Sequence, residues 1–135
     1  MLHVAIIHEN EPMALSFISA ADKVSDLSLL NALGQSALHL AAYVGLPGVV
    51  EALVRRQVPL DTRNRDGNTA LHLACREGHA EVAGLLCAAQ PGLTSVMNYD
   101  GLTCLHLAVK HEHVRIVELL MRHGQNVNVG VGVLS

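Results

Sequence analysis

Histidines at nearly equal spacing are the first feature of this 135-residue sequence that could carry chemistry. His39, His72 and His106 each follow a leucine, and the interval between them is almost constant. Imidazole nitrogens bind zinc and transfer protons near neutral pH, so the series suggests a metal or catalytic site. A structural role is favoured instead, because helical units that carry one histidine each stack about 10 Å apart, too far to share one ion.

A second histidine pattern, His111-Glu112-His113, resembles a fragment of a helical zinc motif. That motif needs histidines four residues apart on one face of a helix, whereas a spacing of two directs the rings to different sides. We expect these residues at a turn between two helices, with His8-Glu9-Asn10 as their counterpart near the N-terminus. The sequence therefore predicts no metal and no cofactor.

The cysteines Cys75, Cys87 and Cys104 are odd in number and include no close-spaced pair. Their spacing predicts neither a disulfide framework nor a zinc knuckle, and it fits a reducing compartment. At small-residue positions of helices they would serve as small apolar side chains. Because no third group recurs near them to orient a histidine, we predict no catalytic residue and no enzymatic activity.

Short helices must position these side chains, and the repeated pattern shows where each helix begins. Ser36, Thr69 and Thr103 stand three residues before the recurring histidines and can accept a first-turn N–H group. First helices are therefore predicted at 37–44, 70–77 and 104–111.

The ends of these helices follow the same repeat. Gly45 and Gly78 suit the left-handed backbone that ends a helix, whereas Glu9 and Glu112 would adopt it at a cost of about 1 kcal/mol each. Second helices are expected where apolar pairs recur three residues apart, at 49–53, 82–86 and 116–120. Turns between repeats are predicted at Asp66-Gly67 and Asp100-Gly101, with Leu33-Gly34-Gln35 at the first junction.

Composition limits the class of protein. Half of the residues are hydrophobic but only 2% are aromatic, which suits short, closely packed helices. No apolar run is long enough to span a membrane, and the acidic N-terminal stretch does not resemble a signal peptide. The formal net charge of −3 disfavours nucleic acid as the main ligand.

The repeated unit resembles the ankyrin repeat, whose signature is Thr-Pro-Leu-His-x-Ala with a period of about 33 residues. The resemblance implies an all-α ankyrin-repeat solenoid in which helix-turn-helix units are joined by β-turn or hairpin loops. We expect one domain at residues 1–128, with repeats at 1–32, 33–65, 66–98 and 99–128, and a C-terminal tail at 129–135. Neither end shows a polar capping repeat, so both ends should expose apolar surface, as in a piece of a longer array.

Several segments are also similar to the inhibitor-of-NF-κB family, which includes IκB and Cactus. They are Leu2–Glu9, Gly67–Cys75, Asn98–Ala108 and Ile116–Leu120. This resemblance implies an inhibitor in immune signal transduction that binds Rel/NF-κB dimers, masks their basic nuclear-localisation segment and retains them in the cytoplasm. The alternative function is that of a generic ankyrin adaptor for an unrelated protein. The alternative location includes the nucleus as well as the cytoplasm. We expect the free chain to be a monomer without membrane, nucleic-acid or small-molecule ligands.

Some features of that family are not found in these residues. There is no Asp-Ser-Gly phospho-degron and no acidic tail, and the fifth and sixth repeats are missing. We therefore expect that these residues do not encode signal-dependent degradation of the protein. We also expect that the partner contacts which the family makes through its later repeats are absent. Short viral mimics of the family lack the same parts, so a viral origin is one alternative.

The partner surface of a solenoid is expected at its turn tips and at the concave ends of its first helices. The predicted partner-binding residues are Tyr43, Val44, Arg63, Arg65, Asp66, Arg76, Glu77, Tyr99, Asp100, Leu102, Lys110 and His111. The predicted structural motif comprises Ser36, His39, Thr69, His72, Thr103, His106, Gly45, Gly67, Gly78 and Gly101. Tyr99 has a second interpretation, as a brace packed on the next turn.

Charged residues outside that set also have two interpretations. Arg55 and Arg56 form a local basic cluster with Arg63, Arg65 and Arg76. This cluster is either a partner contact or a solvated helix end and turn. By family resemblance, the acidic residues Glu9, Glu11, Asp22 and Asp26 of the first unit would face the basic segment of a Rel protein. A plain solvated face is the alternative.

Overall fold

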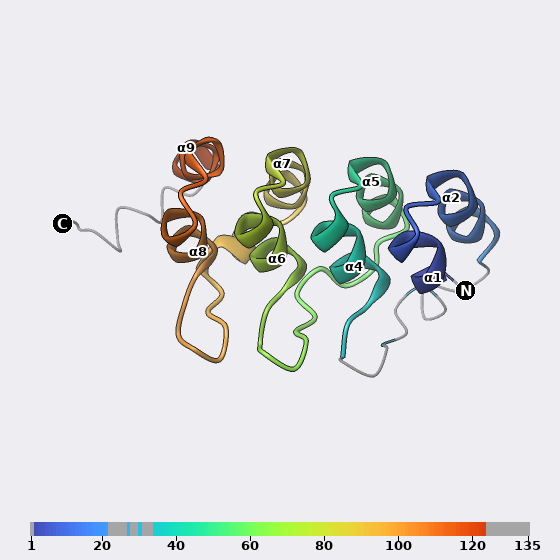
Figure 1. Cartoon of the computed structure of the whole chain (residues 1–135), viewed down its shortest axis with the longest axis horizontal. Coiled ribbons are helices and arrows are strands. Elements are labelled where there is room, and N and C mark those ends of the chain that lie inside the picture. The colour runs from blue at the N-terminus through green and yellow to red at the C-terminus, as the bar shows by residue number, and fades with distance from the viewer. Residues whose placement is uncertain (1, 22–26, 28–29, 31–33, 124–135) are drawn as a thin grey trace.

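The protein is described by a computed structural model that covers residues 2–21, 27, 30 and 34–123. Within these residues every regular element is a helix, and four helix pairs stand side by side in chain order (Figure 1). The pairs are α1 (Leu2–Ile7) with α2 (Glu11–Ala20), α4 (Ala37–Val44) with α5 (Pro47–Arg55), α6 (Ala70–Glu77) with α7 (Ala80–Ala89), and α8 (Cys104–Lys110) with α9 (Val114–His123). The predicted all-α solenoid is confirmed.

The first helix of each of the last three pairs begins at the predicted cap. The hydroxyl oxygens of Ser36, Thr69 and Thr103 accept the backbone N–H of the histidine three residues on, at 3.3–3.4 Å. The cap residues themselves have extended backbone, as helix caps require. The hydroxyl pattern in the sequence therefore set these three helix starts correctly.

The helix ends also follow the prediction, with one difference. Gly45 and Gly78 adopt left-handed backbone, with φ of 91° and 83°. Glu9 and Glu112 hold the same position at φ of 55° and 60°. The predicted helix 104–111 is one residue too long, because His111 is the C-terminal cap and its N–H is shared between two carbonyls of the last turn.

A continuous apolar layer lies between the first and second helices of the pairs. It includes Val49 and Leu53 from α5, Leu86 from α7, and Leu120 from α9, all buried. Each such side chain contributes about 1.5–3 kcal/mol when fully buried. The short 3₁₀ helix η1 (Pro91–Ser95), which was not predicted from the sequence, adds the buried Leu93 to this layer.

The helices of the described part of the chain are all too short or too polar to cross a membrane. Several predictions fall outside the described residues: Leu33 of the first predicted junction, the acidic residues Asp22 and Asp26, residues 124–128 at the end of the predicted domain, and the predicted tail at 129–135. The repeat boundaries stay predictions, because the bounds of the helices do not define the residue at which one repeat ends and the next begins.

Candidate protein-binding surface

The recurring histidines join neighbouring repeats. Nδ1 of His39 accepts the backbone N–H of Ser36 at 3.1 Å, and Nε2 donates to the carbonyl of Asn68 in the next turn at 3.0 Å. His72 repeats the arrangement, with the N–H of Thr69 at 3.1 Å and the carbonyl of Leu102 at 3.1 Å. An N–H group can only donate, so Nδ1 carries no proton and the ring is neutral. Burial lowers the pKa of both histidines.

The structural interpretation of the series predicts contacts of this kind. Both rings are buried, and both nitrogens of each ring are used within the stack. His106 keeps the bond to its own cap, from the Thr103 N–H at 3.0 Å, but its ring is exposed. These histidines align the repeats that carry the surface described below.

Thr69→Ala is expected to lower the free energy of unfolding by about 1 kcal/mol. The substitution removes the oxygen that accepts the His72 N–H and leaves the buried His72 ring without its hydroxyl neighbour at 2.9 Å. Urea unfolding followed by circular dichroism measures the loss. Ser16→Ala, at an exposed site on α2, is the matched control, and equal stability of both variants would contradict the assigned cap.

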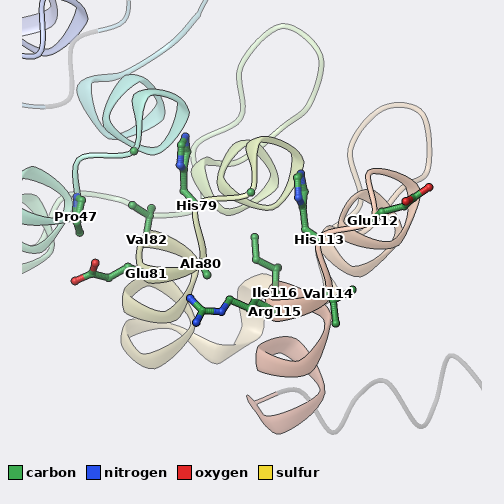
Figure 2. A pocket seen from close by; sticks show the side chains of 12 residues that line it. Pro47, His79, Ala80, Glu81, Val82, Glu112, His113, Val114, Arg115 and Ile116 are labelled. Atoms are coloured by element: carbon green, nitrogen blue, oxygen red, sulfur yellow. The ribbon is translucent and has the colours of Figure 1, made fainter.

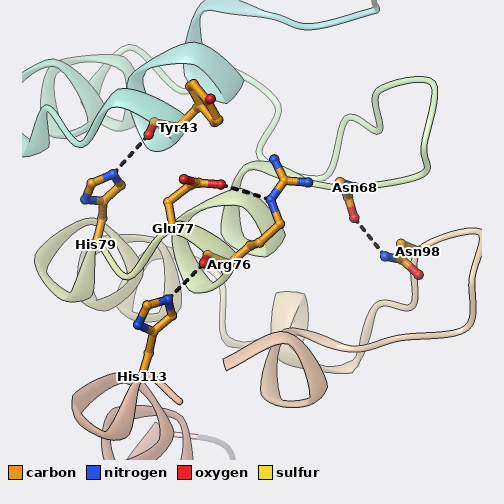
Figure 3. A network of polar contacts seen from close by, with 7 residues as sticks. All are labelled: Tyr43, Asn68, Arg76, Glu77, His79, Asn98 and His113. Carbon is orange, nitrogen blue, oxygen red and sulfur yellow. Dashed lines mark hydrogen bonds and ion pairs between the residues drawn. The ribbon is translucent and has the colours of Figure 1, made fainter. Parts of the chain in front are cut away.

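A second histidine series, which was not predicted from the sequence, joins the start of an outer helix to the end of the first helix in the preceding pair (Figure 3). Nε2 of His79 donates to the carbonyl of Tyr43 at 2.9 Å, and Nε2 of His113 donates to that of Arg76 at 2.9 Å. Each ring lies on a left-handed glycine, Gly45 or Gly78 respectively, close enough that a Cβ atom there would meet it at 2.6–2.7 Å. The spacing of His79 and His113 by one repeat was the available signal.

These two rings line an open groove of about 590 Å³ that crosses the starts of α7 and α9 (Figure 2). The other polar side chains along it are Glu81, Glu112 and Arg115. His113 also stacks with His111, with ring centroids 6.2 Å apart, at the predicted turn between helices. No cluster of three potential metal ligands exists among the described side chains.

The three cysteines are buried and unpaired. A hydrogen bond with Cys104 raises the pKa of the Cys75 thiol well above its usual value, and burial adds to the effect. Burial raises the pKa of Cys87 to about 12. Thiols are nucleophilic only when deprotonated, so Cys75 and Cys87 act as small apolar side chains.

The turns that project from the helices share one construction, visible at the foot of Figure 1. The side-chain oxygen of Asn64 accepts the backbone N–H groups of Asp66 and Asn68, at 2.9 and 3.0 Å. Asn98 does the same in the following turn, and its amide donates to the side chain of Asn68 at 2.9 Å. The Asn-x-Asp-Gly pattern, which recurs one repeat later, could have revealed this role.

Tyr99 links the tips of two turns and remains accessible. Its N–H donates to the carbonyl of Asp66 at 3.2 Å, and its ring lies against Gly67. The brace interpretation placed Tyr99 on the next turn, but the ring packs on the preceding one. The side chain is nevertheless 67% exposed. Arg65 holds the equivalent place against Gly34 one turn earlier and is also exposed.

The exposed ends of the first helices form a ridge of one residue per repeat. Tyr43 and Lys110 are exposed, and Arg76 between them pairs with Glu77 at 3.0 Å. Ile7, which is not among the predicted residues, lies at the same position in the first pair and is exposed. Val44 and Leu102 are half-buried, whereas Arg63, Asp66, Asp100 and His111 are exposed. Most of the predicted residues thus lie at the turn tips or along this ridge, and the other three, Val44, Glu77 and His111, directly follow ridge residues in the sequence.

Comparison with known proteins decides the family. The family model for ankyrin repeats (three copies) matches residues 2–95 and 61–130. The chain is an ankyrin-repeat protein. It is 40% identical to human NF-kappa-B inhibitor alpha over 94% of its own length and 42% of that protein. It is 34% identical to human NF-kappa-B inhibitor epsilon over 98% of its own length and 28% of that protein.

Solved structures agree with this family. The crystal structure of the ankyrin repeat domain of Bcl-3, described as a unique member of the IkappaB protein family, matches with a TM-score of 0.83 and 35% identity. The match covers 91% of this ankyrin-repeat protein and 56% of the Bcl-3 chain. The chain thus has homology to IκB family members over most of its length, while it spans less than half of the two inhibitors compared.

The arginines that the sequence places near one another serve different contacts in this ankyrin-repeat protein. Arg55 pairs with Glu51 on the outer helix at 3.1 Å. Arg56 donates to the carbonyls of Ile18 and Ala21, so it fastens α5 to the end of α2. The solvated or structural interpretation therefore fits these two residues, whereas Arg63 and Arg65 have no ion-pair partner among the described residues.

Proposed function

We propose that this chain is a non-catalytic binding module that binds a Rel/NF-κB dimer and retains it in the cytoplasm. The observation that supports the proposal best is the 40% identity to human NF-kappa-B inhibitor alpha across 94% of the chain. The similarity extends over nearly the whole chain.

The chemistry of the turn tips suits a protein partner. Tyr99 offers a large ring that is already held on one side by Gly67, so little side-chain entropy is lost on binding. Arg63 and Arg65 stand on the neighbouring tip and, within the described part of the chain, have no ion pair to break. Tyrosine and arginine are the residue types that most often dominate the free energy of protein interfaces.

The acidic residues at the start of the chain support one orientation of the partner. Glu9 is exposed at the turn between α1 and α2, and Glu11 is half-buried at the start of α2. The basic localisation segment of a Rel protein would be attracted to this end through charge complementarity. The turn tips of the later repeats would then contact the rest of the dimer.

The deciding experiment is a pull-down of purified Rel-homology dimers, with and without their basic segment. We expect capture of the dimer, with weaker capture once the basic segment is removed. Capture of neither form would reject the proposal and favour an ankyrin adaptor for an unrelated protein. Equal capture of both forms would reject only the role of the acidic end.

Tyr99→Ala and Arg65→Ala are each expected to weaken partner binding by at least about 1 kcal/mol, roughly fivefold in Kd. Both side chains are exposed, so the melting temperature should change little. Isothermal titration calorimetry with the Rel dimer measures the effect, and Tyr99→Phe separates loss of the ring from loss of the hydroxyl.

Glu51→Ala and Arg122→Ala are the controls, because both residues are exposed on outer helices. They should bind the dimer with the wild-type Kd. If these two variants weaken binding while the turn-tip variants do not, the partner surface has been placed on the wrong side of the solenoid.

A further inference from the structure

Two buried thiols meet where the third and fourth helix pairs pack on each other. Cys75 is the sixth residue of α6 and Cys104 is the first residue of α8, and both side chains are fully buried. The two helices lie side by side (Figure 1). The thiol of Cys75 forms a hydrogen bond with that of Cys104. Stacking therefore brings together two sulfur atoms that lie almost one repeat apart in the sequence.

The junction between α4 and α6 has alanines at both of these places. Ala42 is the sixth residue of α4 and Ala70 is the first residue of α6, and both are buried. Because alanine fills the same contact, packing alone does not require sulfur at either place. Small side chains also let the two backbones approach closely, and a disulfide bond needs Cα atoms about 4.4–6.8 Å apart.

Hydrogen bonds give the two thiols different roles. Sγ of Cys104 donates to the carbonyl of Leu93 at 4.0 Å. Its lone pairs can then accept the S–H of Cys75, and this bond is the main reason why the Cys75 thiol retains its proton. A thiolate at Cys104 would keep the same donor beside it. Cys104 is therefore the thiol that supplies the nucleophile.

The short helix η1 covers Cys104. Leu93, whose carbonyl accepts the Cys104 S–H, is buried, whereas Pro91 and Gly92 of the same helix are exposed. Hydrogen bonds in a 3₁₀ helix have poorer geometry than those in an α-helix. A small displacement of η1 is therefore enough to open a path from solvent to Cys104 for a molecule as small as hydrogen peroxide.

We propose that Cys75 and Cys104 form a redox modification site, which hydrogen peroxide converts to a disulfide bond between α6 and α8. The Cys104 thiolate attacks one peroxide oxygen and the O–O bond breaks. The hydroxide that leaves takes up the proton lost by Cys104, so the products are a sulfenic acid and water.

The second step closes the bond. The Cys75 sulfur attacks the Cys104 sulfur, the S–S bond forms and the S–O bond breaks, and the departing hydroxide takes the Cys75 proton as a second water. Two thiols are thus oxidised and one peroxide is reduced to two waters. Small thiols reverse the reaction by thiol–disulfide exchange.

The disulfide would hold α8 on α6, next to the ridge residues Arg76 and Lys110. It would also restrict the unfolded chain, because it closes the loop from residue 75 to residue 104. In the reduced protein the two thiols remain a small apolar contact. The inference does not rest on the proposed function, since neither thiol is exposed to a partner.

Oxidation of the folded full chain with dilute hydrogen peroxide tests the proposal. Mass spectrometry of unreduced peptides should find Cys75 joined to Cys104, with Cys87 still reduced, and dithiothreitol should separate the two peptides. The same treatment in concentrated urea is the comparison. In an unfolded chain the shorter loop between Cys75 and Cys87 closes more readily, so that pair should be the more abundant one there.

Cys75→Ala and Cys104→Ala each reproduce an alanine of the preceding junction, so circular dichroism should show an unchanged fold. Each variant should lose the crosslink, whereas Cys87→Ala should form it at the wild-type yield. Oxidation should raise the urea midpoint of the wild type, and dithiothreitol should restore it, while the midpoints of Cys75→Ala and Cys104→Ala should not rise.

Three results would overturn the proposal. One is a disulfide in the folded wild type that includes Cys87. Another is a bond between two chains in place of the bond within one. The third is a folded chain whose Cys75 and Cys104 stay unpaired under conditions that form disulfides in the urea-unfolded chain.

Discussion

Gly67→Val is expected to destabilise the protein by about 3 kcal/mol or more. Gly67 has a φ of +79°, a backbone conformation that costs an L-residue roughly 1–2 kcal/mol and a β-branched residue more. A Cβ atom there would also lie 2.6 Å from the backbone nitrogen of Tyr99, which cannot move without breaking its bond to Asp66. Forcing extra atoms into such a contact adds about 1–3 kcal/mol. Thermal and urea unfolding measure the sum.

Two other glycines separate the two contributions. Gly101 has the same φ of +79° but nothing within 4 Å of its Cβ position, so Gly101→Val should show the backbone strain alone. Gly92 has neither the strain nor a neighbour, so Gly92→Val should be close to neutral. If Gly67→Val destabilises no more than Gly101→Val, the packing of Tyr99 on the preceding turn is wrong.

The parts of the fold that the sequence predicted are those that depend on nearby residues. A hydroxyl three residues before a histidine defines a helix start through bonds within one turn, as at Thr69. A glycine after the last turn, as at Gly78, relieves a local steric conflict. Both signals act over a few residues. Because they recur with the repeat period, they define equivalent helix starts and ends along the chain.

The contacts that the sequence did not predict join residues about one repeat apart. The His79 ring reaches the carbonyl of Tyr43, and any residue type supplies a carbonyl, so no sequence signal marks the acceptor. The ring of Tyr99 packs on Gly67 of the preceding turn only because stacking brings the two turns together. The direction of that packing depends on how successive turns are offset in space, and the repeat period gives no information about that offset.

The sequence predicted only part of the candidate surface. Exposed turn residues such as Tyr99 and Arg65 follow from the repeat pattern, because a turn tip projects wherever the helices end. Residue type alone does not indicate that Ile7 is exposed, because isoleucine is usually buried, whereas its register position places it on the ridge. Comparison of register positions identifies such exposed apolar residues better than residue type does.

Acidification should destabilise the protein through the two buried histidines. Burial, as the larger cause, lowers the pKa of His39 and His72 below the ordinary value of 6.5, although bonds to the carbonyls of Asn68 and Leu102 offset part of it. A proton on Nδ1 would also repel the N–H groups that now point at it. The unfolded chain therefore binds more protons than the folded chain below pH 6.5.

The direction of the pH effect on stability follows from the linkage between proton binding and folding. The stability supplied by the neutral rings is complete above pH 6.5 and is lost as the pH falls from there toward the folded-state pKa values. Each additional proton bound by the unfolded chain lowers the free energy of unfolding by at most about 1.4 kcal/mol per pH unit. Urea midpoints measured between neutral pH and about pH 5 should therefore fall steadily.

His39→Gln combined with His72→Gln should flatten the dependence of the urea midpoint on pH, while His8→Gln, at an exposed site, should retain it. An equally steep slope in the double variant would show that other groups cause the acid sensitivity.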